Sequence, residues 1–345
     1  MKLKKFNFEL PKELVAYFPS KERSLSRLLV VNDPLEDLIF KDLPRLLNPN
    51  DTLVINDTKV IKARLFAKKS TGAKVEILIE RLLDRNCALV LTKANSRLEP
   101  GERITLNDDK TTVEFLEKKE NIWRVKFSDP IKELLNNLGH VPLPPYIKRE
   151  ATDEDLERYQ TIYADASKDF SVAAPTAGFH FNHSLMEEIV LSGVSIAKVT
   201  LHIGLGTFKP LSSENIKNNR LHNEIFNVPK EAVDAINRTR RKGGRVISVG
   251  TTALRAIESA CNFNNGLLTP CSGETDLFIY PGYKFMITDS LITNFHLPKS
   301  SLFILLCAFG GYEKMKSSYQ HAIKKKYRFY SYGDAMFVNL ESNNL

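Results

Sequence analysis

A run of small residues that ends on a histidine is the first segment of the sequence that could do chemistry. Residues 173–181 read AAPTAGFHF, so His180 lies between two phenylalanines. Small residues leave room for a flat ring such as a purine, and histidine can exchange a proton near neutral pH. A tightly packed loop with a hydrogen-bonded core histidine is an equally good interpretation. His180 and His183 also have an HxxH spacing, but no third ligand follows in register, so we do not expect a metal site.

A second candidate lies where a buried strand is expected to turn through glycine into a helix. Residues 245–258 read RVISVGTTALRAIE, which places Thr251 and Thr252 at the start of the helix. Backbone N–H groups at a helix N-terminus bind anions, and neighbouring hydroxyls can assist with a carboxylate. A threonine that only caps a core helix is at least as good an interpretation. Arg255 and Glu258 are spaced i, i+3 and could form a plain helix ion pair.

Two further segments follow predicted strands and carry residue types suited to a ligand site. Gly204, Gly206 and Thr207 follow one strand, and glycine lets a backbone approach a ligand closely. Taken alone, two such glycines more often form a simple turn. Asn294 and His296 follow another strand, at the position where α/β folds bind ligands. The sequence contains no GxGxxG or Walker A motif, so we expect neither NAD nor ATP.

The segment 324–334 combines positive charge with aromatic residues. It reads KKKYRFYSYGD. Cations grip phosphates and aromatic rings stack unpaired bases, so this combination is typical of RNA contacts. Three lysines at a solvated helix end are the ordinary alternative, and the sequence leaves both open.

The composition is that of a globular protein with a modest excess of positive charge. The 345 residues include 49 Lys and Arg against 41 Asp and Glu, which gives a net charge of +8. This length suggests about two domains, and the charge favours a polyanionic partner such as RNA. No stretch approaches the roughly 20 apolar residues of a membrane span, and the N-terminus lacks the apolar core of a secretory signal. We therefore expect a cytoplasmic protein with no membrane association.

The order of predicted elements gives an α/β main domain with a small domain inserted in it. Residues 61–139 contain five short β-rich runs about ten residues apart, which predict a small antiparallel β-barrel. A proline cluster then marks the return to the main domain, to which we assign 1–60 and 140–345. Helices and strands alternate there, and we expect a barrel-like α/β arrangement.

The predicted elements have the following bounds. The inserted domain has strands at 74–82, 87–93, 103–106, 111–117 and 122–127. The main domain has strands at 195–202, 245–250 and 290–295, and helices at 153–159, 184–192, 230–241, 251–261, 302–309 and 313–326.

With these residues in view, the whole chain resembles the S-adenosylmethionine:tRNA ribosyltransferase-isomerases of queuosine biosynthesis. Two positions depart from the family: Phe170 stands where glycine is usual, and His183 matches no family motif. The resemblance rests on ten motifs in order, at 17–19 with Arg23 and 27–28, 56–60 with 63–65, 139–147, 158–161 with Tyr163, 172–181, 199–208, 249–255 with 258–259, 278–282, 293–298 and 327–337.

The resemblance implies a specific reaction. The ribosyl part of S-adenosylmethionine is transferred and isomerised onto 7-aminomethyl-7-deazaguanine at the wobble position of tRNA with a GUN anticodon. Epoxyqueuosine-tRNA forms, and adenine and methionine leave. The resemblance further implies a monomer that needs no cofactor beyond S-adenosylmethionine, which is a co-substrate.

On the matching positions we expect three groups of site residues. The expected catalytic residues are His180, His202 and His296. The expected substrate-binding residues are Pro175, Thr176, Ala177, Gly178, Gly204, Gly206, Thr207, Thr251, Thr252, Arg255 and Asn294. The expected RNA-binding residues are Arg23, Arg27, Tyr327, Arg328, Tyr332 and Asp334. The inserted barrel could bind RNA or serve only as a scaffold.

Two other function classes fit parts of the sequence. An RNA-binding module without catalysis would explain the basic tail and the barrel, but not the histidine, threonine and glycine segments of the α/β part. A methyltransferase would also use S-adenosylmethionine, but the sequence lacks its glycine-rich turn after a first strand.

Overall fold

The computed structural model describes residues 3–204, 206 and 211–341, and the chain divides into two compact units. The main unit comprises Met1–Thr58, Gln160–Asp165 and Pro175–Leu345, and the barrel unit comprises Lys59–Tyr159 and Ala166–Ala174. The inserted part is therefore longer than the predicted 61–139. Among the described residues, no helix has both the length and the apolar composition that a membrane span requires.

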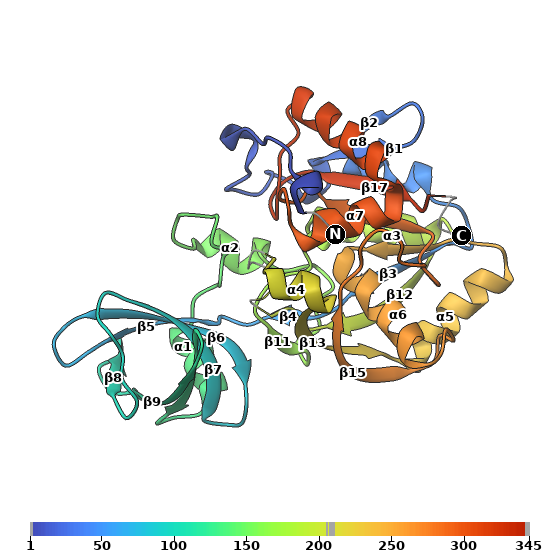
Figure 1. The fold of residues 1–345 in the computed structure, drawn as a ribbon. Helices are drawn as coiled ribbons and strands as arrows, with labels where there is room; N and C mark the ends of the chain where they lie inside the picture. Colours follow the sequence, from blue (N-terminus) through green and yellow to red (C-terminus); the bar gives the residue numbers. More distant parts are fainter. Residues whose placement is uncertain (1–2, 205, 207–210, 342–345) are drawn as a thin grey trace. The chain divides into compact units, whose positions relative to one another are not determined.

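A nine-stranded mixed sheet forms the centre of the main unit (Figure 1). β12, β3, β14 and β16 are parallel neighbours, and β17 is antiparallel to β16 but parallel to β1. In sheet order the strands are β15 (Cys271–Leu277), β13 (Arg220–Val228), β12 (Ser195–Leu201), β3 (Thr52–Asn56), β14 (Val246–Val249), β16 (Ser290–Asn294), β17 (Ala335–Asn339), β1 (Arg27–Val31) and β2 (Glu36–Ile39).

The central strands are buried on both faces, which is why they appear in the sequence as nearly continuous apolar runs. All five residues of β3 and of β16 are buried. Successive residues face different cores. In β16, Ile292 belongs to the core that holds α3, whereas Leu291 belongs to the core built on α7 and α8.

Helices cover the two faces of the sheet. α5 and α6 pack against β12, β3 and β14, and α7 packs on α8. Side-chain caps begin two of the helices: Asn182 accepts from the N–H of Leu185 at α3, and Ser300 accepts from the N–H of Phe303 at α7. The helices are α3 (His183–Leu191), α4 (Ser213–Asn218), α5 (Lys230–Arg241), α6 (Thr251–Phe263), α7 (Ser301–Gly310) and α8 (Tyr312–Lys324).

Short 3-10 helices complete the described part of the main unit. Two of them, η4 and η5, supply residues to the core that holds α3. Their bounds are η1 (Leu3–Phe6), η2 (Lys12–Leu14), η3 (Arg23–Leu25), η4 (Phe40–Leu46) and η5 (Thr176–His180).

The barrel unit contains a closed antiparallel barrel of six strands. Alternate residues point inward, as in β10, where Trp123, Val125 and Phe127 are buried. In barrel order the strands are β10 (Ile122–Phe127), β7 (Cys87–Ala94), β6 (Lys74–Leu82), β5 (Arg64–Lys68), β8 (Arg103–Leu106) and β9 (Thr112–Lys119). The unit also contains β4 (Lys59–Val60), β11 (Asp169–Ser171), α1 (Ile131–Leu138) and α2 (Asp153–Arg158).

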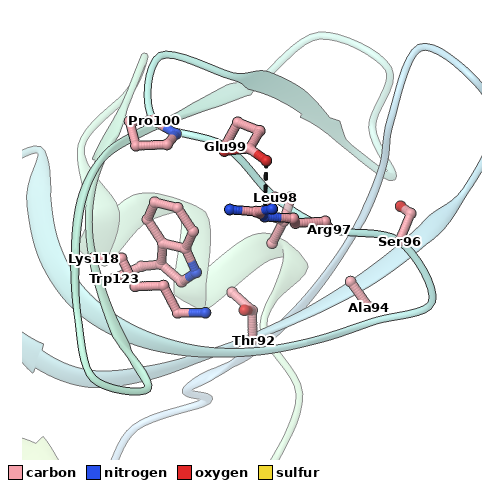
Figure 2. Close-up of a pocket in the computed structure, with 9 residues that line it drawn as sticks. All are labelled: Thr92, Ala94, Ser96, Arg97, Leu98, Glu99, Pro100, Lys118 and Trp123. Atoms are coloured by element: carbon pink, nitrogen blue, oxygen red, sulfur yellow. Dashed lines mark ion pairs between the residues drawn. The ribbon is translucent and has the colours of Figure 1, made fainter.

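A cavity of about 490 Å³ opens at the barrel beside Trp123 (Figure 2). The Lys118 ammonium lies 5.4 Å from the centroid of the indole, which is only 2% exposed. Arg97 and Glu99 form an ion pair of 2.9 Å in the wall, as Figure 2 shows. The indole is thus a covered part of the barrel core and offers little surface on which a base could stack.

The α/β class and the inserted small β-barrel are both confirmed. The five predicted barrel strands are present, and β5 is a sixth that the sequence pattern missed. The main sheet is open, with β15 and β2 as its edge strands, and does not form the barrel-like arrangement expected for the main domain. Within the described residues, only the smaller unit contains a closed barrel. Phe170, the departure from the family glycine, lies on β11 with 47% of its surface exposed and with the Lys132 ammonium 4.5 Å from its ring.

Candidate active site

The carboxyl ends of four neighbouring parallel strands lie at one edge of the main sheet. In open α/β sheets, this is the edge where ligands bind. Each strand is followed within two residues by, or ends on, a polar residue: Thr58 after β3, His202 after β12, Thr251 after β14 and Asn294 on β16. Several predicted site residues that are far apart in the sequence therefore share this edge.

Asn294 is the centre of a hydrogen-bond network at this edge. It is 2% exposed, and its Nδ2 donates to the carbonyl oxygen of Tyr330 over 3.1 Å. Because a carbonyl can only accept, this bond fixes the orientation of the amide. Thr176 Oγ1 donates to Asn294 Oδ1 over 3.1 Å, and Asn294 Nδ2 lies 3.2 Å from His180 Nε2. Asn294 thus joins β16 to η5 and to the segment before β17.

His180 is buried within this network and is 3% exposed. Its Nε2 accepts from Asn294, so Nδ1 carries the proton and donates to Ser26 Oγ over 2.6 Å. Its ring stacks on Phe40, with centroids 4.9 Å apart. Burial, assisted by the charges of two nearby arginines, lowers the pKa of His180 to about 3. His180 is therefore a neutral histidine with both ring nitrogens engaged, and its geometry suits positioning of Asn294 better than proton exchange.

His202 is the half-buried histidine at the same edge. Its Nδ1 lies 2.8 Å from Thr58 Oγ1. Asn56 fixes the strands beneath them, because its side chain donates to the carbonyl of Leu201 over 2.9 Å and accepts from the N–H of Leu201 over 3.0 Å. His202 and the buried Thr58 thus form a polar pair on rigid strand ends, and the partly exposed His202 is the member that a substrate at this edge could reach.

His296 lies apart from His180. Its Nε2 is 2.8 Å from Thr293 Oγ1, and its N–H donates to the hydroxyl of Tyr319 over 2.9 Å. Thr293 and Asn294 are neighbours on a strand, so their side chains point to opposite faces of the sheet. Burial lowers the pKa of His296 to about 3. The structure does not bring His296 into the network of His180.

The glycine segment after β12 lies against β13. The N–H of Gly204 donates to Glu224 Oε1 over 3.3 Å. A Cβ added to Gly206 would lie 2.3 Å from the His222 ring, so only glycine fits this close approach. Thr207 lies outside the described residues.

Arg255 on α6 is held by a buried ion pair. It is 5% exposed, its Nη1 contacts Glu224 Oε2, and its Nε donates to the carbonyl of Leu277 over 3.1 Å. Its Nη2 has no hydrogen-bond partner within the described residues, and neither does the buried Oγ1 of Thr252, one turn earlier on α6. Buried polar atoms without partners are rare, and a missing water or ligand is a common reason for them.

The alternative helix pair between Arg255 and Glu258 is wrong. Glu258 is fully buried and accepts from the backbone N–H groups of residues 286–288 over 3.0, 3.1 and 3.1 Å. Burial raises the pKa of this carboxyl. Glu258 therefore anchors the segment before β16 to α6. Thr251 begins α6 directly after Gly250, whose φ of +90° is in the region that favours glycine.

The small residues of η5 pack against the start of α6. A Cβ added to Gly250 would lie 3.5 Å from that of Ala177, and one added to Gly178 would lie 2.1 Å from the hydroxyl of Tyr163. Pro175 is buried immediately before η5. The Tyr163 hydroxyl is buried and has no hydrogen-bond partner within the described residues, and burial raises its pKa. Like Arg255 Nη2 and Thr252 Oγ1, it is a buried polar atom without a partner in the described part of this unit.

Known proteins are similar to the chain along nearly its whole length. A family described as "Queuosine biosynthesis protein" matches residues 3–338. The chain belongs to this family. Three relatives named S-adenosylmethionine:tRNA ribosyltransferase-isomerase are similar to it. They come from Vesicomyosocius okutanii (50% identical, 100% of this chain and 99% of the relative), Acinetobacter baylyi (45%, 98% and 99%) and Nitrosospira multiformis (45%, 98% and 98%).

A solved structure of a member supports the fold assignment. The crystal structure of S-adenosylmethionine tRNA ribosyltransferase from Thermotoga maritima is 33% identical in sequence and has a TM-score of 0.55. The similarity covers 96% of this chain and 99% of that one. The family resemblance read from the sequence motifs is thereby confirmed.

Three of the residues that the family motifs suggested for RNA binding are buried. Tyr327, Tyr332 and Asp334 are 0%, 3% and 4% exposed. Asp334 accepts from the backbone N–H groups of Arg27 over 3.0 Å and of Arg328 over 2.8 Å. A buried ring cannot stack a base, so the structure assigns these three side chains to holding the segment in place.

The three arginines of that set are partly exposed. The guanidinium of Arg27 lies 3.6 Å from the centroid of the Tyr327 ring. Arg328 donates to the carbonyl of Phe18 over 3.2 Å, and Arg23 donates to a backbone carbonyl of η5 over 3.3 Å. RNA contact remains a prediction for these arginines.

Several residues of the site were missed as individual candidates, among them Thr58 and Asn56. Ser26 binds His180, Tyr163 lies against η5, and Asp57 accepts from Thr200 Oγ1 over 2.7 Å while only 1% exposed. Asp57 and Tyr163 belong to family motifs, and Ser26 lies beside one, which was the available signal. Glu224 had none, because it lies in a charged segment that resembles an exposed loop.

Proposed function

We propose that the chain is an S-adenosylmethionine:tRNA ribosyltransferase-isomerase that binds its sulfonium nucleoside at the carboxyl edge of the main sheet. The activity rests on one observation: the chain matches the queuosine biosynthesis family and three relatives of that name along its whole length. It thus performs the ribosyl transfer and isomerisation step of queuosine biosynthesis.

The chemistry of this step makes defined demands on the site. The sulfonium acidifies the adjoining ribose carbon, so a base must remove a proton there. Opening of the sugar expels adenine, which leaves more readily when an acid protonates it. The amine of the modified base then attacks, and epoxide closure displaces methionine. The site must therefore hold a carboxylate, a purine and one group that transfers protons.

The unpaired buried atoms support placement of the substrate at α6. The Nη2 of Arg255 and the Oγ1 of Thr252 lie one helical turn apart, which places both on the same helix face. Guanidinium nitrogens and hydroxyls suit a carboxylate, so we assign them to the methionine end. The small residues 175–178 of the neighbouring segment then suit the adenosine.

We assign proton transfer to His202 and positioning to His180. His202 is half-buried, so part of its side chain reaches the surface at this edge, whereas His180 is 3% exposed and lies inside the buried network. Replacement of His202 by Gln should abolish adenine release while S-adenosylmethionine still binds. Replacement of His180 by Gln should lower the rate and also destabilise the fold. Equal activity of His202→Gln and wild type would remove His202 from the mechanism.

The direct test uses tRNA that carries 7-aminomethyl-7-deazaguanine. The protein is incubated with this tRNA and S-adenosylmethionine, and the digested nucleosides and small products are analysed by mass spectrometry. We expect epoxyqueuosine, adenine and methionine in equal amounts. Formation of S-adenosylhomocysteine would indicate a methyltransferase, and tRNA binding without turnover would indicate a binding module. Either result would overturn the proposal.

The finer features of the reaction are proposals as well. We expect modification only of tRNAs with a GUN anticodon, a single chain as the active species, and activity in the cytoplasm. No cofactor beyond S-adenosylmethionine is required, because proton transfers and displacement at a sulfonium need neither metal nor redox chemistry. Activity should therefore persist after exhaustive treatment with EDTA, and light scattering of the active protein should give the mass of one chain.

A further inference from the structure

A groove of about 400 Å³ lies on the main unit between the N-terminal segment and α8. Its floor is apolar and includes Phe8, Phe303 and Ile323. The Phe8 ring packs edge-on against Phe303, with centroids 5.1 Å apart. The hydroxyl of Tyr312 donates to the carbonyl of Lys5 over 2.6 Å and so ties the N-terminal segment to α8. The groove therefore has fixed walls.

The rim of the groove is cationic. Lys5, Lys316 and Lys324 line it with exposed side chains, and Glu9 is the single acidic residue among its lining residues. Lys316 and Lys324 are eight residues apart on α8, which places them on one face of the helix about 12 Å apart. Two exposed lysines, Lys325 and Lys326, continue the positive charge beyond the helix, so the rim complements an extended polyanion.

One lining residue of the groove contacts the segment that directly follows β16. Tyr319 lines the groove, and its hydroxyl accepts from the N–H of His296, two residues after β16. Its ring packs against Phe295, with centroids 5.4 Å apart. A ligand in the groove would thus lie behind the strand end that carries Asn294.

We propose that this groove binds the sugar-phosphate backbone of the tRNA substrate, outside the modified nucleotide. This inference rests on the proposed function, which supplies a polyanion that must extend well beyond one base. Phosphates suit the lysine rim, and the sugars and bases suit the partly exposed rings of Phe8 and Tyr312. An acidic protein segment would match the same charges, but it would have no reason to lie beside the strand end of the candidate site.

The test compares two double variants in tRNA binding as a function of salt. Lys316→Gln with Lys324→Gln removes the rim charges of α8. The matched control, Lys314→Gln with Lys242→Gln, removes two exposed lysines that do not line the groove. Because each phosphate contact releases counterions, the plot of log Kd against log salt should become flatter by about 2 for the rim variant. Its affinity at 0.1 M salt should fall roughly tenfold or more.

Each outcome decides the proposal. A selective loss of affinity and slope in the rim variant supports it. An unchanged slope overturns it and leaves the groove to an acidic protein partner, and an equal loss in the control also overturns it by showing a general charge effect. Adenine release by the wild type distinguishes failure of the groove proposal from failure of the proposed function. If the wild type releases adenine and the rim variant binds tRNA normally, only the groove proposal fails, and if the wild type releases none, the proposed function fails.

Discussion

Replacement of Asn294 by alanine should destabilise the main unit and slow catalysis together. The side chain makes hydrogen bonds to Thr176, His180 and Tyr330, and it is 2% exposed. A buried hydrogen bond contributes about 1 kcal/mol, so loss of three lowers the free energy of unfolding by about 3 kcal/mol. The carbonyl of Tyr330 and the Nε2 of His180 are left without this donor inside the protein.

The catalytic effect follows from the position of the network. Asn294 lies on β16 at the carboxyl edge and holds Thr176, the first residue of η5, in place. A displacement of about 1 Å in a positioned group can cost about 100-fold in rate. We therefore expect kcat for adenine release to fall by one to two orders of magnitude, on the order of the loss expected from misplacement alone.

Thr239→Val provides a matched control. Thr239 Oγ1 lies 2.5 Å from Thr52 Oγ1, at the start of β3 and thus at the opposite edge of the sheet. This variant should lose about 1 kcal/mol of stability and keep wild-type kcat. The assays are urea unfolding and adenine release at a temperature where both variants are folded. Wild-type kcat in Asn294→Ala would show that the network is only structural, and unchanged stability would contradict the hydrogen bonds themselves.

Three further predictions concern burial, charge and space. Burial lowers the pKa of both His180 and His296 to about 3, so below pH 6.5 the unfolded chain binds more protons than the folded chain. The free energy of unfolding should therefore fall by up to ~2.7 kcal/mol per pH unit between pH 6.5 and 3. Equal urea midpoints at pH 7.5 and 5.5 would contradict this. Glu224→Gln should cost about 3 kcal/mol because it leaves the buried Arg255 cation uncompensated, and Arg255→Met in the same chain should restore much of the loss in urea unfolding; no recovery would argue against the pair. Gly178→Ala should destabilise the fold by about 1 to 3 kcal/mol, since the new methyl group would meet a tyrosine hydroxyl at 2.1 Å, and a thermal midpoint equal to wild type would refute the close contact.

Local patterns determined much of the secondary structure. In the barrel strands, alternation of apolar and polar residues matches the period of a strand with one buried face, so 74–82 and 122–127 were predicted with the observed bounds. Six strands of the main sheet, β1, β2, β3, β13, β15 and β17, are absent from the predicted elements. β13 and β15 carry charged or exposed residues at several positions, and the buried Glu224 of β13 pairs with Arg255. That pairing leaves no trace in local periodicity.

The sequence by itself determined the family, the α/β class and the inserted barrel, because motifs and hydrophobic periodicity are properties of short segments. The tertiary structure alone decided the roles of the side chains. His180 is held by Ser26 and Asn294, which are 154 and 114 residues away, and Arg255 pairs with Glu224 rather than with Glu258 one turn along the helix. The burial and the partners of a side chain depend on which distant strands the sheet brings side by side. Burial and partners in turn determine whether a histidine or a carboxylate carries charge.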